Sequence, residues 1–342
     1  MTSLVTSLSV AIRKSLGGVV DTALDRSVVL GYTKLGSGVR RLWWPADPAA
    51  NAMAGKRVVV TGATSGIGEA MAGSFARLGA TVHLLGRDAA KVCRSAGAVR
   101  ASVPDAEVVE EVCDVSDLDA VRAWTTDLAG RIDALHGVVH NAGLMPKRRD
   151  ETGQGHEIQL ACHVLGPHLM TVRLLDLLQV PDRAAVVFMS SGGMYTEPLR
   201  TWSVDELESR DGPYNGVRTY ARTKRMQVVL AGEWAKALAG SGIHVYSAHP
   251  GWVETPGVAE ALPVFRSVTK PLLRHAEDGA DTAVWLVATC PESKPGHFWH
   301  DRAQRPTTFG WQRRQDPRAV AALLDEVSAL TGTEHSVVSG HN

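Results

Sequence analysis

The amino-acid sequence predicts an α/β protein in which helices cover both faces of a parallel sheet. From residue 57 onward, short runs rich in valine, leucine and isoleucine alternate with longer segments of helical periodicity, which is typical of such a sheet. Several of the short runs lack polar alternation, as expected for strands that are buried on both faces. A glycine-rich loop joins the first run to the first helical segment, a third feature of this fold class.

The composition is that of a globular protein with a sizeable core, since 44% of the 342 residues are hydrophobic and 21% are charged. Basic and acidic side chains both number 36, so the net charge is zero and no nucleic-acid partner is indicated. No run of about 18 apolar residues occurs, so no membrane-spanning helix is expected, and the N-terminus lacks the pattern of a secretion signal.

The cysteines are widely spaced and form no CxxC motif. We therefore expect reduced core thiols, no metal site, and an intracellular, cytoplasmic protein. The cysteines are Cys93, Cys113, Cys162 and Cys290.

The expected strands follow one another along the chain at 57–62, 81–87, 107–115, 135–143, 184–191, 243–251 and 296–301. Helical patterns fall between them near 66–78, 117–129, 155–178, 217–239 and 278–289. The chain is divided into an N-terminal arm (1–54), a central domain (55–302) and a C-terminal extension that contains a helix (303–342).

Two segments lie outside this alternation. Residues 1–24 have apolar side chains at helical spacing, which predicts an amphipathic helix. It could lie on a membrane surface, but we favour packing on its own domain or in a homo-oligomer, with the LWWP stretch at 42–45 holding the arm on the core. The proline-broken, apolar segment 253–275 is expected to form a lid.

The loop TGATSGIG, residues 61–68, lies between the first strand and the first helix. Gly62 allows the tight turn, Gly66 lets backbone amides approach a phosphate, and Gly68 lets the helix pack closely on the strand. The N-terminus of that helix adds a partial positive charge. Glycine-rich loops also form ordinary turns, but this position between strand and helix is typical of a dinucleotide site.

The second strand ends at Gly86 and Arg87, where an NAD site usually has an acidic residue for the ribose 2′-hydroxyl. A guanidinium suits a 2′-phosphate, and the hydroxyl of Ser65 can add a donor. This arrangement favours NADP(H) over NAD(H). The plain alternative is a solvated Arg87 that pairs with Asp88.

Several motifs together resemble the short-chain dehydrogenase/reductase family over roughly residues 55–300. They are TGATSGIG (61–68), CDV (113–115), HNAG (140–143, with His140 in place of an asparagine), SSGGM (190–194), YARTK (220–224) and HPGWVETPGV (249–258). The resemblance implies a Rossmann-like, doubly wound parallel sheet of about seven strands in a single domain. It also implies a nicotinamide-dependent oxidoreductase of a carbonyl/alcohol pair.

The same resemblance implies the roles of individual residues. Tyr220 would exchange a proton with the substrate oxygen, Ser191 would orient that oxygen, and Lys224 would hold the ribose; Ser190 would buttress Ser191. Residues 192–216 would form an extra loop at the substrate mouth. The implied cofactor contacts are Gly62, Ser65, Gly66, Ile67, Gly68, Arg87, Asp114, Val115, Asn141, Ala142, Gly143, Tyr220, Lys224, Pro250, Gly251, Val253 and Thr255.

Tyr220 and Lys224 are four residues apart, so on a helix both side chains rise from one face. Such pairs also occur by chance, with the tyrosine packed and the lysine reaching water. Lowering a tyrosine pKa from about 10 to about 7 takes about 4 kcal/mol. An ammonium about 4 Å away supplies a term of that order at an effective dielectric of about 20, so we expect Lys224 to lower the pKa of Tyr220.

His163 stands where the family often has an asparagine that holds a water in a proton relay. An imidazole can also bind a water and can titrate near neutral pH, which makes His163 a candidate catalytic residue. It could equally be a packed core histidine.

The leading interpretation is an NADP(H)-dependent reductase or dehydrogenase of a small-molecule carbonyl or alcohol, with a lipophilic substrate favoured by the apolar lid. A non-catalytic NADP(H)-binding sensor or scaffold is the alternative, although a sensor has no need of a proton donor. Sugar-nucleotide epimerisation fits less well, because it usually needs a larger C-terminal substrate domain.

Overall fold

A computed structural model describes residues 21, 31–255, 266–267, 269–295, 297–309, 312 and 315–334. The amphipathic helix expected over residues 1–24 lies outside the described residues, apart from Asp21. The same holds for residues 256–265 and 268 of the expected lid. Among the described helices, none is both long and apolar enough to cross a membrane.

An eight-stranded sheet runs through the molecule in the order β3-β2-β1-β4-β5-β6-β7-β8. Strands β1 to β7 pair in parallel, and β8 pairs antiparallel with β7. The strands are β1 Arg57–Thr61, β2 Thr81–Gly86, β3 Val108–Val112, β4 Gly137–His140, β5 Ala184–Met189, β6 Ile243–Ala248, β7 His297–His300 and β8 Ala303–Pro306. All the predicted strands are therefore present, and β8 was not predicted.

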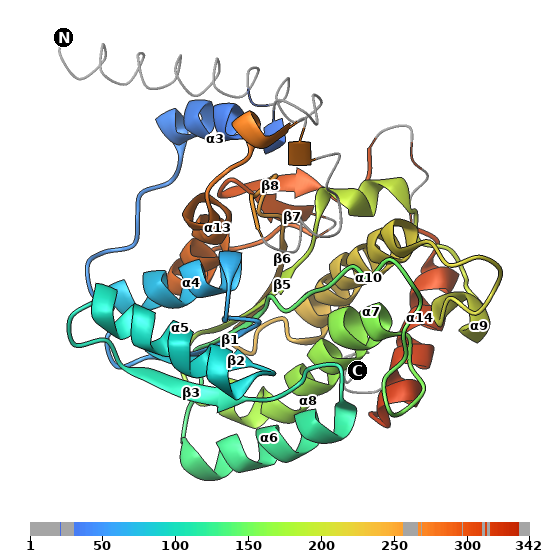
Figure 1. Cartoon of the computed structure of the whole chain (residues 1–342), viewed down its shortest axis with the longest axis horizontal. Coiled ribbons are helices and arrows are strands. Elements are labelled where there is room, and N and C mark those ends of the chain that lie inside the picture. Colours follow the sequence, from blue (N-terminus) through green and yellow to red (C-terminus); the bar gives the residue numbers. More distant parts are fainter. Residues whose placement is uncertain are drawn as a thin grey trace.

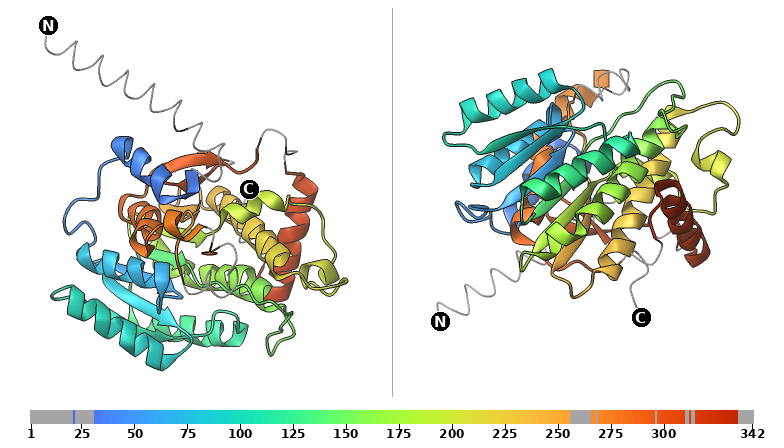
Figure 2. Two further views of the ribbon diagram at one scale, coloured as in Figure 1. Left: turned by 45° about the horizontal axis from the view of Figure 1, so that its top comes forward. Right: turned by 90° about the horizontal axis from the view of Figure 1, so that it is seen from below.

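Helices cover both faces of this sheet (Figures 1 and 2). One face carries α4, α5 and α13, which span Gly66–Arg77, Ala89–Ser102 and Ala276–Thr289. The other face carries α6, α8 and α10, which span Leu118–Arg131, Gly166–Gln179 and Gly216–Ala237. In the C-terminal extension, α14 (Pro317–Thr331) packs against α8 and α10.

Strand β1 shows why the strands read as unbroken apolar runs. Val58, Val59 and Val60 are all fully buried. Val58 and Val60 belong to the core under α4 and α13, whereas Val59 belongs to the core under α6 and α8. Because successive side chains of a strand point to opposite faces, a sheet with two covered faces needs apolar residues at every position.

The single helix predicted over 155–178 consists of three parts. A short helix α7 (Ile158–Leu160) leads into a π-helical turn, Ala161–Leu165, and then into α8. At the end of the π-helical turn, a Cβ on Gly166 would lie 1.8 Å from the carbonyl oxygen of Val115. The helix therefore approaches the end of β3 at a distance that only glycine allows, and the turn contains His163.

Several shorter elements were not predicted. Helix α5 was missed although Val92, Ala96 and Val99 form a buried stripe at helical spacing. The insertion at 192–216 contains a 3₁₀ turn, η3 (Gly192–Thr196), and helix α9 (Val204–Leu207). The remaining elements are α3 (Lys34–Arg40), η1 (Arg41–Trp43) and η4 (Lys270–Leu272).

Buried hydrogen bonds hold the insertion on the domain. Just after α9, Glu208 is 1% exposed and its carboxylate accepts from the backbone N–H of Glu157, at 2.6 Å, and pairs with Nδ1 of His156, at 2.9 Å. The insertion is thus folded against the start of α7 and is not a loose loop.

The described part of the N-terminal arm, from residue 31 onward, begins near β8 and passes α13 on its way to β1 (Figure 1). The guanidinium of Arg302 lies 4.9 Å from the ring centroid of Trp44, and Nε1 of Trp285 donates to the carbonyl oxygen of Ala46. Leu42 is 82% exposed, so only part of the LWWP stretch faces the core. The expectation of four core thiols is also wrong in one case, because Cys93 is exposed on α5.

The sheet order reverses between β1 and β4, which lie side by side although two other strands separate them in the chain. In an open α/β sheet, ligands bind in the crevice at the carboxyl ends of the strands where the order reverses. The glycine-rich loop follows β1 and the HNAG stretch leads out of β4, so both lie at this point.

Candidate active site

The loop after β1 has the backbone that a phosphate cradle requires. Gly62 and Gly66 have positive φ angles of 64° and 54°. Residues other than glycine adopt such backbone angles only at a cost in conformational free energy. A Cβ on Gly68 would lie 2.3 Å from the carbonyl oxygen of Gly62 and 2.5 Å from Nδ2 of Asn141. Only glycine therefore fits at the start of α4, and the first helical amides stay open to a ligand.

Asn141 joins the end of β4 to this loop. Its Nδ2 donates to the carbonyl oxygens of Thr61 and Gly62, at 3.0 and 3.3 Å. The backbone N–H groups of Asn141 and Ala142 both donate to Oγ1 of Thr61 at 3.0 Å. The two segments that flank the crevice are thus held in one fixed arrangement.

The end of β2 carries an exposed cation. Arg87 makes no hydrogen bond or ion pair with any other residue that the structure describes. Asp88, its expected alternative partner, caps α5 instead by accepting from the N–H of Lys91 at 3.0 Å. The exposed Ser65 makes no side-chain capping bond at the start of α4. Both side chains are therefore available to a ligand.

The family motif at the end of β3 is also ordered. One carboxylate oxygen of Asp114 accepts from the N–H and the hydroxyl of Ser116, at 2.9 and 2.6 Å. Val115 is buried behind it, with its carbonyl oxygen against Gly166. Asp114 thus has a fixed orientation and a second oxygen that remains for a ligand.

Ser191, Tyr220 and Lys224 come together from two elements. Ser191 follows β5 and is the N-cap of η3, where its oxygen accepts from the N–H of Gly193 at 3.2 Å. Tyr220 and Lys224 lie one turn apart on α10, with Nζ of Lys224 5.3 Å from the centroid of the Tyr220 ring. The hydroxyl of Ser190 donates to the carbonyl oxygen of Lys224 at 2.8 Å, which joins the end of β5 to α10.

Lys224 is 3% exposed and is directed at protein acceptors. Its ammonium donates to the carbonyl oxygen of Met189 at 2.8 Å and to Oε1 of Gln227 at 3.0 Å. Burial lowers the pKa of Lys224 to about 8, because a low-dielectric environment disfavours the charged form. The group still carries its charge at neutral pH.

The environment acts on Tyr220 in the opposite direction from the one predicted. Burial raises the pKa of Tyr220 above its ordinary value, and a hydrogen bond with the side chain of Ser191 only partly opposes this. The charge of Lys224 does not offset burial here because its Nζ points to Met189 and Gln227. At neutral pH the phenol therefore keeps its proton.

His163 is fully buried, and both of its ring nitrogens are occupied by protein groups. Nε2 accepts from the N–H of Leu144 at 3.1 Å, so the ring proton resides on Nδ1, which lies 2.8 Å from Oγ1 of Thr223. Burial and the charge of Lys224 hold the pKa of His163 well below its ordinary value. The geometry is that of a neutral, packed histidine, and the expected titration near neutral pH does not fit it.

The loop after β6 bounds the other side of the site. Gly251 has a φ of 83°. Val253 is buried and forms a parallel bridge with Arg274. A Cβ on Gly279 of α13 would lie 3.4 Å from the Cβ atom of Pro250. Thr255 is the last residue described before the gap in the lid. Ile67 at the start of α4 also faces Gly279, so this loop and the glycine loop meet at α13.

Sequence reasoning missed two polar residues of α10 that complete the site. Thr223 hydrogen-bonds with His163 and with the carbonyl oxygen of Tyr220, and Gln227 connects Lys224 to the carbonyl oxygen of His163 at 2.8 Å. Positions 220, 223, 224 and 227 follow the 3–4 spacing of one helix face. That spacing is visible in YARTKRMQ and could have identified both residues.

Comparisons with known proteins agree with this arrangement. The family model described as short chain dehydrogenase matches residues 56–203. The chain belongs to the short-chain dehydrogenase/reductase family and is an NAD(P)-dependent oxidoreductase. It is 35% identical over 250 residues to Dehydrogenase/reductase SDR family member 12 of Homo sapiens, which covers 72% of this chain and 77% of that protein.

Two further likenesses support the same assignment. Retinol dehydrogenase 12 of Bos taurus is 33% identical over 250 residues, covering 72% of this chain and 78% of that protein. The crystal structure of an uncharacterized protein from Mycobacterium Paratuberculosis matches with a TM-score of 0.64 and 25% identity, covering 86% of this chain and 98% of that one. The fold and the family expected from the motifs are thus confirmed.

Proposed function

We propose that this protein is an NADP(H)-dependent oxidoreductase that interconverts a lipophilic carbonyl compound and its alcohol at Ser191, Tyr220 and Lys224. The observation that carries the proposal is the convergence of Ser191 and Tyr220, which share a hydrogen bond, with the buried ammonium of Lys224 beside the Tyr220 ring. Family membership and an intact proton donor favour an enzyme over a sensor or scaffold.

The residues at the carboxyl ends of the strands are arranged as a dinucleotide site requires. The glycine cradle of Gly62, Gly66 and Gly68 leaves the N-terminus of α4 open, and a helix N-terminus attracts phosphate. The carboxylate of Asp114 would contact the adenine ring. Asn141, Ala142 and Gly143 would support the nicotinamide from β4, and Pro250, Gly251, Val253 and Thr255 would do so from β6. When bound, the cofactor supplies or accepts the hydride.

The preference for NADP(H) rests on the end of β2. Gly86 and Arg87 replace the acidic residue that would hold a ribose 2′-hydroxyl. Arg87 makes no hydrogen bond or ion pair with another residue in the described part of the chain, and Ser65 is exposed beside it. A forked, unengaged guanidinium and a hydroxyl are the donors that a 2′-phosphate accepts from.

The proton chemistry is assigned to Tyr220. Because burial raises its pKa, the phenol is protonated at neutral pH, which is the form that donates to the oxygen of a carbonyl undergoing reduction. Ser191, hydrogen-bonded to Tyr220, orients that oxygen. Nζ of Lys224 lies 5.3 Å from the centroid of the Tyr220 ring, and Ser190, Met189 and Gln227 hold Lys224 in place.

A lipophilic substrate is proposed from two observations. The relatives include retinol dehydrogenases, and the segment after β4 places the apolar residue Leu144 beside His163, which its backbone N–H contacts. The insertion at 192–216, anchored through Glu208, would form the rim of the substrate mouth.

The test is turnover of NADPH and NADH with a panel of long-chain aldehydes, retinal and small ketones, followed by absorbance at 340 nm. Tyr220→Phe keeps the ring and should lower kcat at least about 10²-fold, the scale of a positioned proton-transfer group, with NADPH affinity unchanged. Tyr246→Phe is the matched control, because that phenol donates to the carbonyl oxygen of Pro291 and lies in the core. Native turnover in Tyr220→Phe would exclude Tyr220 as the acid.

A further inference from the structure

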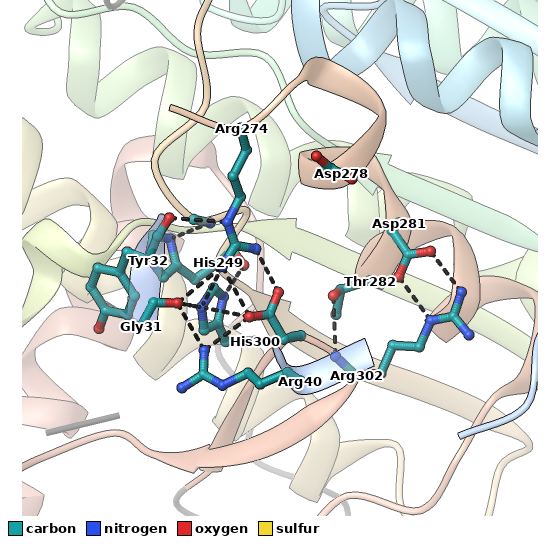
Figure 3. A network of polar contacts seen from close by, with 12 residues as sticks. Gly31, Tyr32, Arg40, His249, Arg274, Asp278, Asp281, Thr282, His300 and Arg302 are labelled. Carbon is teal, nitrogen blue, oxygen red and sulfur yellow. Dashed lines mark hydrogen bonds and ion pairs between the residues drawn. The ribbon is translucent and has the colours of Figure 1, made fainter. Parts of the chain in front are cut away.

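The N-terminal segment 31–40 lies directly against the loop that follows β6 (Figure 3). The carbonyl oxygen of Tyr32 accepts from the N–H of Trp252 at 2.8 Å and from Nε of Arg274, 242 positions away in the chain, at 3.0 Å. The carbonyl oxygen of Gly31 accepts from Arg274 at 3.0 Å and from Arg40 at 2.9 Å. The arm is therefore bonded to the loop through its backbone.

Arg274 makes two of these four bonds and is 1% exposed. Its guanidinium also donates to both carboxylate oxygens of Asp301, at 2.5 and 2.9 Å. Its own N–H donates to the carbonyl oxygen of Trp252 at 2.8 Å, and its carbonyl oxygen accepts from Glu254 at 3.0 Å. The side chain of one residue thus holds the arm, while its backbone holds the loop.

Gly251 shows how closely this guanidinium approaches the loop. A Cβ on Gly251 would lie between 2.4 and 2.8 Å from three atoms of the Arg274 side chain. The side chain of Arg274 occupies the space that any larger residue at 251 would need. The path of residues 250–253 is therefore defined by the position of Arg274.

The ring of Tyr32 packs on the opposite side of the site, against the turn that begins at Ser191. A Cβ on Gly192 would lie 2.6 Å from Cε2 of Tyr32, and the rings of Tyr32 and His249 meet edge to face with centroids 4.4 Å apart. Tyr32 is 3% exposed. Its ring fills the space between the serine turn and the end of β6.

Arg274 belongs to a buried cluster of ion pairs. Burial would raise the pKa of Asp301, but the guanidinium groups of Arg274 and Arg40 outweigh it and keep the carboxylate ionised. Burial lowers the pKa of His300 to about 3, so that imidazole is neutral. Two guanidinium groups on Asp301 therefore form a fixed ion-paired anchor between the arm and the β7–β8 turn.

We propose that residues 31–40 are a positioning element of the active site, acting through Tyr32 and Arg274 on the 250–253 loop and on the Ser191 turn. The inference rests on the proposed function in one respect, namely that residues 250–253 bound the nicotinamide end of the cofactor. Docking of the arm and binding of the cofactor are then coupled, and each strengthens the other by the same factor.

Hydrogen exchange of the full-length protein tests the coupling directly. Saturating NADP⁺ should slow amide exchange in peptides covering 249–255 and also in peptides covering 31–40. Peptides of α14 (Pro317–Thr331) should not change, because that helix packs on α8 and α10. Protection of 249–255 without any protection of 31–40 would overturn the proposal.

Two variants test the same contact, by hydrogen exchange without cofactor and by titration with NADP⁺. Arg274→Lys keeps the positive charge but loses the several N–H donors of the guanidinium. Amide exchange at 249–255 should therefore rise about tenfold, and the Kd of NADP⁺ should rise by about the same factor, which is a typical size for coupling between two sites. Arg302→Lys is the matched control: Arg302 pairs with Asp281 and contacts the arm at Pro45, and it should leave 249–255 unchanged. Equal exchange in wild type and Arg274→Lys would contradict the inference.

A further variant covers the case in which Arg274→Lys does not fold. Tyr32→Leu replaces the ring and its hydroxyl with a smaller aliphatic group but keeps the backbone carbonyl, and it should raise exchange at 190–194 and 249–255. Unchanged exchange there would also overturn the proposal. Tyr220→Phe, measured in parallel, should lack turnover but exchange like wild type. If Tyr220→Phe is fully active, the proposed function fails while the exchange data still decide the role of the arm.

Discussion

The rings of His163 and Tyr220 meet edge to face, with centroids 5.5 Å apart and planes at 88°. Both ring nitrogens of His163 are hydrogen-bonded to protein groups, so neither is left to hold a water. The imidazole instead packs in a fixed orientation against the phenol of Tyr220. We propose that His163 is a positioning residue, in place of the relay role that the sequence left open.

Substitutions of His163 separate the two roles. His163→Leu should lower the melting temperature, because the N–H of Leu144 loses its acceptor and Thr223 loses a hydrogen-bond partner, and it should lower kcat more than NADPH affinity. The wild-type kcat profile should be flat between pH 6 and 7, since the pKa of His163 is held well below that range. A change of kcat between pH 6 and 7 that disappears in His163→Asn would contradict this and support the relay role of His163.

The cofactor preference can be reversed at one position. Arg87→Asp should weaken NADPH binding about 10- to 100-fold, since hydrogen bonds to charged groups contribute about 1.5–3 kcal/mol and each 1.4 kcal/mol is a factor of ten. NADH binding should change little. Fluorescence titration of both cofactors measures this, with Arg94→Asp, an exposed residue on α5, as the control for charge. Equal losses for the two cofactors would mean that Arg87 does not contact the 2′-phosphate.

The glycine cradle predicts a contrast within α4. Gly68→Ala places a Cβ against Gly62 and Asn141 and should abolish cofactor binding while lowering the melting temperature. Gly73→Ala meets nothing closer than 3.5 Å, the end of the Arg77 side chain, and should be neutral or stabilise by up to about 1 kcal/mol, as alanine is favoured in helices. Cofactor binding by Gly68→Ala at native affinity would argue against the cradle.

Stability should fall steeply with acid below about pH 6.5. Burial lowers the pKa of seven histidines among the residues that the structure describes. The pKa falls to about 3 for His140 and His300, to about 4 for His168, well below the ordinary value for His163 and His249, and by a smaller amount for His136 and His244. Below pH 6.5 the unfolded chain binds protons that the folded chain does not, so the free energy of unfolding decreases as pH decreases. Each such histidine contributes up to about 1.4 kcal/mol per pH unit.

Melting temperatures from pH 8 to pH 4.5 check this expectation. His168→Gln should flatten the decline by about one proton, because that side chain contacts Thr333 and not the proposed active site. Asp301 adds a further loss only below about pH 4, where its lowered pKa begins to matter. A melting temperature that is constant from pH 7 to pH 5 would show that these histidines bind protons equally in the folded and the unfolded chain.

The sequence predicted the strands and the glycine loop because both depend on local pattern. The runs around Val58–Val60 are apolar on both faces, and Gly62 and Gly68 are needed by the backbone itself. The pair of Tyr220 and Lys224 was visible for the same reason, since one helical turn fixes its geometry. Helix α5 was missed although its stripe of Val92, Ala96 and Val99 was equally local.

Other features depend on contacts that no local pattern encodes. The bond between Tyr32 and Arg274 joins positions 242 residues apart. The direction of the Lys224 ammonium depends on the carbonyl oxygen of Met189, at the end of a different element. The raised pKa of Tyr220 follows from burial, which depends on how the whole chain packs.

Strand β8 protects one edge of the sheet against pairing with a further strand. It is four residues long and ends at Pro306, which has no N–H to donate, and the Pro306 carbonyl oxygen is already taken by the hydroxyl of Tyr195 at 2.6 Å. Short, proline-containing edges of this kind prevent sheets from joining between copies. A chain cut after Asp301 would instead expose β7, with Phe298 and Trp299, and should aggregate through that edge during folding.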